Sequence, residues 1–142
     1  MDMMAVSATW TLVVTLLPAI DQGLGLAEVA PISWFILANM FVGNVLFDIM
    51  DIEGNKAAGV RTLSVILGAR KTTILLLLIS SARWPLLPGL SEQATALGTK
   101  LMLYRYACII YFRKRRASPS LDLFVDGEWM LAILTLTAAG MI

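Results

Sequence analysis

Long apolar stretches separated by short charged segments dominate the chain. A helix that crosses a membrane needs about 20 mostly apolar residues. Two stretches meet this need clearly, whereas the third is interrupted by Arg83 and two prolines and the fourth is short and contains Arg105. The pattern predicts one all-α membrane domain over residues 1–142, a multi-pass bundle of about five spans near residues 3–20, 29–47, 72–90, 99–112 and 123–142.

The composition favours contact with lipid and narrows the possible chemistry. Hydrophobic residues make up 58% and charged residues 15% of the chain, against roughly 45–50% and 25% in soluble domains. A net charge of +1 gives no basis for nucleic-acid binding. The absence of histidine removes His-based triads and His-ligated zinc. Any catalysis would therefore use carboxylates, amines, hydroxyls or a metal held by oxygen.

The positive charges fall in alternate connections between the expected spans. Segments 21–28 and 91–98 contain no lysine or arginine, and the other two connections contain eight. Because cytosolic loops carry the excess of basic residues, the alternation predicts an integral membrane protein with segments 48–71 and 113–122 in the cytosol. The first stretch has no basic residues before it and is not expected to be a signal peptide. The eight basic residues are Lys56, Arg61, Arg70, Lys71, Arg113, Lys114, Arg115 and Arg116.

A cluster of acidic residues follows the second apolar stretch directly. If the helix continues past Phe47, then Asp48, Asp51 and Asn55 fall within about 60° of one another around its axis. Mg²⁺ is usually held by one or two carboxylates together with substrate phosphates, and Lys56 and Arg61 could neutralise phosphate charge. The segment therefore predicts a site for magnesium-bound phosphate or pyrophosphate. The alternative is that these acids and bases pair with one another and have no further role.

Residues 48–71, DIMDIEGNKAAGVRTLSVILGARK, resemble the second aspartate-rich motif of the UbiA family of intramembrane prenyltransferases. The family pattern is roughly D-x-E-G-D, a short spacer and G-x-x-T-L-P-V-x-L-G. The acids, Gly54, Gly59 and the Thr62-Leu63 and Leu67-Gly68 pairs stand at the expected offsets. The five expected spans then resemble helices five to nine of the nine-helix family fold, and the predicted sidedness agrees with that placement.

The resemblance implies roles for individual residues. Asp51 takes the place of the first aspartate of the DxxxD pair, which holds Mg²⁺ bridged to an isoprenyl pyrophosphate. Asn55 stands in place of the second aspartate, and its uncharged amide is expected to weaken metal binding, for which Asp48 could compensate. Lys56 and Arg61 are expected to contact the pyrophosphate. Ser64 replaces the usual proline and is expected to loosen the backbone.

The implied activity is transfer of an isoprenyl group from its pyrophosphate to an aromatic or other lipophilic acceptor. The family's first aspartate-rich motif is not found before Asp48, so the chain alone is expected to be inactive or impaired. Its partners would be the missing N-terminal half or another membrane chain, besides membrane lipid. Two alternatives stay open: a diverged, non-enzymatic membrane protein or partner subunit, and a small transporter fragment whose Arg83 and Arg105 line a pathway.

A few polar residues outside this motif allow more than one interpretation. Arg105 could reach the membrane surface or pair with an acid inside the bundle. Asn39 is expected to form hydrogen bonds between helices. Asp126 and Glu128 are interpreted as a helix cap and a first-turn acid at the start of the last span, or as residues at the cytosolic boundary, in preference to a catalytic carboxylate pair.

Overall fold

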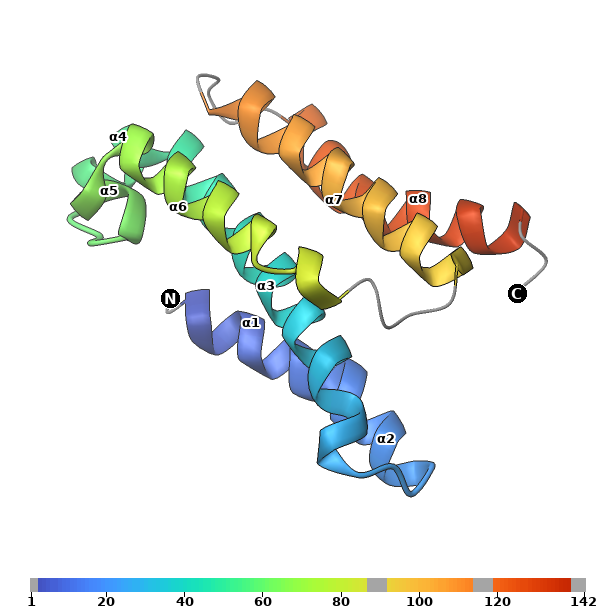
Figure 1. The fold of residues 1–142 in the computed structure, drawn as a ribbon. Coiled ribbons are helices and arrows are strands. Elements are labelled where there is room, and N and C mark those ends of the chain that lie inside the picture. Colours follow the sequence, from blue (N-terminus) through green and yellow to red (C-terminus); the bar gives the residue numbers. More distant parts are fainter. Residues whose placement is uncertain (1–2, 87–91, 114–118, 139–142) are drawn as a thin grey trace.

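The computed structural model describes residues 3–86, 92–113 and 119–138, and all the regular structure in these ranges is helical (Figure 1). The all-α prediction is therefore confirmed for this part of the chain. The order is α1 (Met3–Thr11), the π-helical turn η1 (Leu12–Leu16), α2 (Leu17–Asp21), α3 (Leu26–Met50), α4 (Ile52–Ala57), α5 (Leu63–Leu67), α6 (Ala69–Ser81), η2 (Trp84–Leu86), α7 (Glu92–Phe112) and α8 (Pro119–Ala138).

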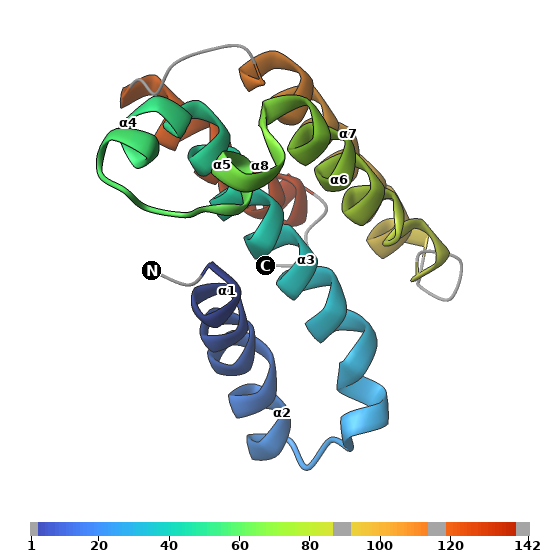
Figure 2. The ribbon, with the colours of Figure 1, turned by 90° about the vertical axis from the view of Figure 1, so that its left-hand side faces the viewer.

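The first two long helical segments form a hairpin. α1, η1 and α2 follow one another without a break, and α3 runs back along them (Figure 2). The turn passes through Gly23, whose φ of +68° is costly for residues with a side chain. α3 then begins at a cap in which the Gly25 N–H donates to the Glu28 carboxylate at 2.8 Å. With this cap, α3 starts at Leu26, three residues before the predicted start of the span at residue 29.

Polar side chains join α1 and η1 to α3 within the hairpin. The Asn44 amide donates to the Ser7 hydroxyl at 3.0 Å, and the Ser33 hydroxyl donates to that of Thr15 at 2.9 Å. Such bonds between membrane helices contribute about 0.6 kcal/mol each. They fix the register of two helices whose remaining contact is apolar.

The hydrophobic core lies where α3, α6 and α7 meet. α3 contributes residues at spacings of three and four, which place them on one face of a helix. Leu76 from α6 and Ile109 from α7 close the core from the other side, and both are fully buried. The buried cluster consists of Val42, Val45, Leu46, Ile49, Met50, Leu76, Cys108, Ile109 and Phe112.

The C-terminal ends of α3 and α7 lie at the same end of the bundle, since Ile49 and Phe112 belong to one buried cluster. α4 and α5 sit at this end, away from the turn between α2 and α3 (Figures 1 and 2). The connections that follow α3 and α7 therefore begin at the same end of the bundle. The predicted sidedness requires this arrangement. Lys114, Arg115 and Arg116 of the second connection lie outside the described residues.

Two segments of the described chain are long and apolar enough to cross a membrane: Met4–Asp21 and Leu26–Met50. α7 and α8 have 21 and 20 residues, which is about 30 Å of helix, but both contain charged residues. α6 has only 13 residues and ends at Ser81, so the predicted span over 72–90 is not one straight helix as far as residue 86. Residues 87–90 lie outside the described part of the chain.

The helices leave many large apolar side chains exposed. Exposed fractions reach 56% for Trp10, 72% for Ile20 and 65% for Leu134. Soluble monomers rarely expose large contiguous apolar patches. These faces are suited to lipid or to another apolar surface.

Segment 48–71 is divided into two short helices by glycines. α4 ends at Ala57, and the turn after it passes through Gly59, with φ of +69°. The Val60 N–H closes this turn on the Asn55 carbonyl at 2.8 Å. Gly68, with φ of 78° and ψ of 156°, separates α5 from α6. This backbone conformation is essentially restricted to glycine.

Gly68→Ala is expected to lower the free energy of unfolding by about 1–3 kcal/mol, the cost of such a strained residue. No other atom lies within 4 Å of the position a Cβ would take there, so the loss would come from the backbone alone. Thermal unfolding in detergent, followed by circular dichroism, measures it. Gly25→Ala is the control, because its added Cβ would make only an ordinary contact at 3.7 Å. An equal effect of both substitutions would contradict this explanation.

Candidate functional site: an acidic helix junction and a buried ionic cluster

The predicted ligand residues lie at the junction of α3 and α4. Asp48 is 6% exposed near the end of α3. The Asn55 side chain of α4 lies close enough to influence this carboxylate, and the charge of Asp51 also acts on it. The three side chains therefore lie close to one another, although α3 breaks at Asp51 and does not continue through Asn55 as predicted. Their role as metal ligands stays a prediction.

The position of the Asp51 carboxylate depends on Gly54. A Cβ added at Gly54 would lie 2.3 Å from one carboxylate oxygen of Asp51 and 2.9 Å from the other. Atoms cannot approach so closely, so any side chain at position 54 would displace this carboxylate. The lack of a side chain at Gly54 therefore leaves space for the exposed Asp51 carboxylate at the junction.

Ser64 links α5 to the end of α3 at the same junction through a hydrogen bond. Its hydroxyl is fully buried and donates to the Asp48 backbone carbonyl at 2.9 Å. Thr62 caps α5 by accepting from the Val65 N–H at 3.3 Å. The Ser64 hydroxyl thus makes a contact that a proline side chain could not, and the expectation that serine loosens the backbone here stays a prediction.

The predicted phosphate-binding side chains are accessible. Lys56 lies in the last turn of α4, Arg61 lies in the link to α5, and both are exposed. Among the described residues, no three acidic, histidine or cysteine side chains converge. The side chains that this junction offers near a metal are two carboxylates and an amide, and their oxygens are donors of the kind that Mg²⁺ prefers.

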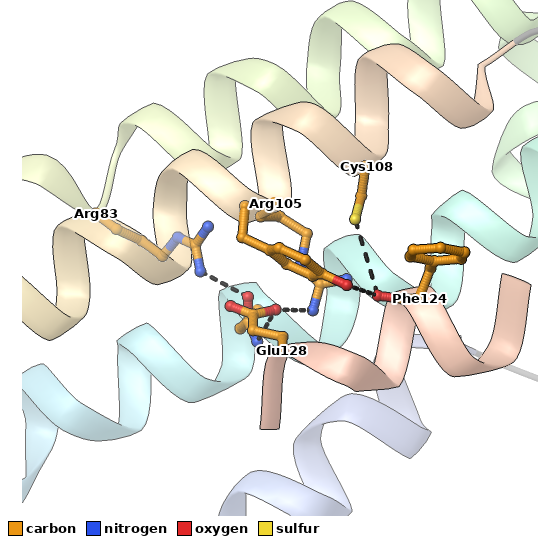
Figure 3. A network of polar contacts seen from close by, with 7 residues as sticks. Arg83, Arg105, Cys108, Phe124 and Glu128 are labelled. Atoms are coloured by element: carbon orange, nitrogen blue, oxygen red, sulfur yellow. Dashed lines mark hydrogen bonds and ion pairs between the residues drawn. The ribbon is translucent and has the colours of Figure 1, made fainter. Parts of the chain in front are cut away.

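A second polar cluster is buried between α3, α7, α8 and the turn after α6 (Figure 3). Arg105 of α7 forms an ion pair with Glu128 of α8. Asn39 of α3 bridges to both sides: its amide nitrogen donates to Glu128 Oε2 at 3.1 Å, and its amide oxygen accepts from Arg83 Nη1 at 2.8 Å. All four residues are at most 2% exposed.

The apolar surroundings of this cluster make its contacts strong. The Arg83 guanidinium lies 5.0 Å from the centre of the Phe35 ring, a cation–π contact that gains strength when desolvated. Arg83 Nε also donates to the Ser80 carbonyl at 3.4 Å. Buried charges are tolerated only when paired and hydrogen-bonded, so this cluster orients four separate segments with respect to one another.

The interpretation of Asp126 and Glu128 as the start of a helix is wrong. α8 begins at Pro119, which places both residues inside the helix, and Glu128 is the buried partner of Arg105. The expected hydrogen bonding of Asn39 between helices is confirmed. Of the two interpretations of Arg105, pairing with an acid inside the bundle is correct. The sequence signal for this cluster was the isolated charges within apolar stretches.

Tyr104 and Cys108 complete the contact between α7 and α8. Both side chains donate to the backbone carbonyl of Phe124, the thiol at 3.9 Å (Figure 3). A Cβ added at Gly127 would lie 3.1 Å from the Tyr104 hydroxyl. The two helices therefore approach closely beside the ion pair.

Comparisons of the chain with protein-family models, with curated proteins and with solved structures find no match. The function has to be argued from the residues of this chain.

Proposed function

We propose that this chain binds an isoprenyl pyrophosphate through Mg²⁺ at the junction of α3 and α4, as part of a UbiA-type prenyltransferase. The observation that carries the proposal is the proximity of Asp48, Asp51 and Asn55 at this junction. These are the oxygen-bearing residues of the motif, and the basic residues Lys56 and Arg61 are exposed close by in the sequence.

The proposal includes a multi-pass arrangement in the membrane, with five spans and with segments 48–71 and 113–122 in the cytosol. Its support is the pair of long apolar segments, the exposed apolar side chains of α1 and α8, and the common end of the bundle at which the connections after α3 and α7 begin. An apolar isoprenyl chain would then lie against the helices while its pyrophosphate stays at the cytosolic end.

Each residue at the junction has a distinct part in this proposal. Asp51, which is exposed, would ligate the metal directly, and Asp48 would hold the Asn55 amide with its oxygen free to coordinate. Lys56 and Arg61 would contact the remaining phosphate oxygens. A bound divalent cation supplies charge neutralisation for the leaving pyrophosphate. Because Asn55 contributes no charge, we expect turnover to need further ligands from another segment or chain.

Purified chain in lipid nanodiscs is expected to bind geranyl or farnesyl pyrophosphate only when Mg²⁺ is present. Equilibrium binding of the radiolabelled pyrophosphate, with Mg²⁺ and with EDTA, measures this. Binding that is equal under the two conditions, or absent from both, would refute the proposal.

Asn55→Asp is expected to lower the Mg²⁺ concentration needed for half-maximal binding by about tenfold or more, the range found when residues close to a metal are altered. The reason is the added carboxylate charge at the second ligand position. Gln93→Glu, an equivalent change at an exposed position of α7, is the control for a general effect of negative charge. If the control shifts the Mg²⁺ dependence as much as Asn55→Asp, the placement of Asn55 is wrong.

The transport alternative has less support. Arg83 and Arg105 are held by Asn39 and Glu128 in contacts that join helices, an arrangement suited to a fixed structural or binding role. A non-enzymatic membrane partner would fail the pyrophosphate-binding experiment, so the same measurement separates it from the proposed activity.

A further inference from the structure

The buried cluster between α3, α7 and α8 has an uncompensated positive charge. It combines the guanidiniums of Arg83 and Arg105 with one carboxylate, that of Glu128. The two guanidiniums are close enough for each charge to act on the other, and Glu128 acts on both. Arg83 and Arg105 both point toward Glu128 (Figure 3). The side chains of this cluster therefore carry a net charge of +1 in a buried position.

The same cluster contains hydrogen-bond donors that the described residues do not satisfy. These are Arg83 Nη2, Arg105 Nε and Nη1, and the Ser80 hydroxyl, all buried. Nearly all buried polar groups in proteins have a partner. Beside these donors one buried acceptor, Glu128 Oε1, also has no partner among the described residues. Three guanidinium nitrogens against one carboxylate oxygen leave donors in excess, so what is missing is a further acceptor.

We propose that this cluster is a binding site for a small, singly charged anion, either chloride or the carboxylate of a small molecule. A water molecule could accept hydrogen bonds but would leave the charge uncompensated, and an isolated buried charge is far more costly than an unpaired dipole. One negative charge makes the cluster neutral, whereas a pyrophosphate would make it strongly negative. Asn39 and Phe35 hold Arg83, and Glu128 holds Arg105, so the donors are positioned in advance.

This site is separate from the proposed metal site. Asn39 and Asp48 lie on the same helix, and their positions along its axis differ by about 13 Å. The anion would bind midway along α3 and α8, with the junction of α3 and α4 beyond it. Because the two sites share no side chain, Asp51→Ala is expected to keep the response to anions.

Thermal unfolding of the full chain in zwitterionic nanodiscs tests the proposal. The reference buffer contains potassium gluconate, whose anion is too bulky for a buried site, and it is replaced by chloride or acetate at constant ionic strength. Ligands that bind only the folded state raise the melting temperature. We expect a rise of several degrees that saturates with chloride or acetate. A response to chloride alone identifies an inorganic ion, and a response to acetate alone identifies a carboxylate ligand.

Two substitutions of opposite effect separate binding from a structural role. Arg83→Gln removes one positive charge, balances the cluster, and is expected to abolish the anion-dependent rise. Glu128→Gln removes the negative charge and is expected to enlarge the rise, even though it lowers stability in gluconate. Arg70→Gln, at an exposed position of α6, controls for general salt effects. The proposal is overturned if the wild-type melting temperature is the same in all three salts, or if Arg83→Gln retains the full rise.

Discussion

Glu128→Ala is expected to be the most destabilising single substitution considered for this chain, with a loss of about 3–5 kcal/mol in the free energy of unfolding. The side chain is 1% exposed and is paired with Arg105. It also accepts from the Asn39 amide at 3.1 Å. Its removal leaves two buried guanidiniums without a carboxylate, and an unpaired buried charge costs far more than the pair contributes. Reversible unfolding in mixed micelles with gluconate as the anion measures the loss.

Two comparisons make this result specific. Glu92→Ala, at an exposed position in the first turn of α7, is expected to change stability by about 0.5 kcal/mol or less. The double substitution Arg105→Met with Glu128→Met is expected to recover most of the stability lost in Glu128→Ala, because apolar side chains of similar volume replace a buried pair well. A loss below about 1 kcal/mol in Glu128→Ala would show that the buried cluster has been misassigned.

Asp51→Ala is expected to reduce Mg²⁺-dependent binding of geranyl pyrophosphate by at least about 100-fold, the upper end of the effect of residues that only support metal ligands. In the proposed site this exposed carboxylate is the direct ligand, and neither Asp48 nor Asn55 can take its position. The measurement is the binding titration in nanodiscs with Mg²⁺ present. Asp21→Ala, an exposed acid at the end of α2, is the matched control and should bind as the unchanged chain does.

Gly54→Ala tests whether metal binding depends on the position of the Asp51 carboxylate. The added Cβ would lie 2.3 Å from the Asp51 carboxylate, so it displaces the ligand without removing it. We expect a loss of about 10- to 100-fold in Mg²⁺ affinity and little change in stability, because Gly54 is exposed. Unchanged binding in Gly54→Ala, together with loss in Asp51→Ala, would mean that the carboxylate binds from another position.

The local features of the fold could be predicted from the sequence. The helical class follows from the long apolar stretches, and the grouping of Asp48 with Asn55 follows from their spacing along the chain. The start of α3 at Leu26 also had a local signal, because Gly25 and Glu28 stand at the spacing of a helix cap. The break between α3 and α4 at Asp51 was less predictable, because the chain becomes helical again at the next residue, Ile52.

The buried cluster could not be predicted from pattern alone. The Arg83–Asn39 bond joins residues 44 positions apart, and the Asn39–Glu128 bond joins residues 89 positions apart. Isolated charges in apolar stretches indicated that Arg83 and Arg105 needed partners, but which partners they have depends on how α3, α7 and α8 pack. The acids at 126 and 128 resemble an N-terminal helix signal and so predict a helix start there, whereas the helix begins earlier, at Pro119.

The central claim is that the Asp51 carboxylate holds a divalent cation together with a pyrophosphate. The most direct measurement replaces Mg²⁺ by Mn²⁺ and labels the aspartate carboxyl carbons with ¹³C, so that electron–nuclear double resonance reports carboxylates bound to the metal. With geranyl pyrophosphate present, we expect a strong ¹³C coupling that is retained in Asp21→Ala and lost in Asp51→Ala. A Mn²⁺ ion that binds pyrophosphate and water without any ¹³C coupling would contradict the claim.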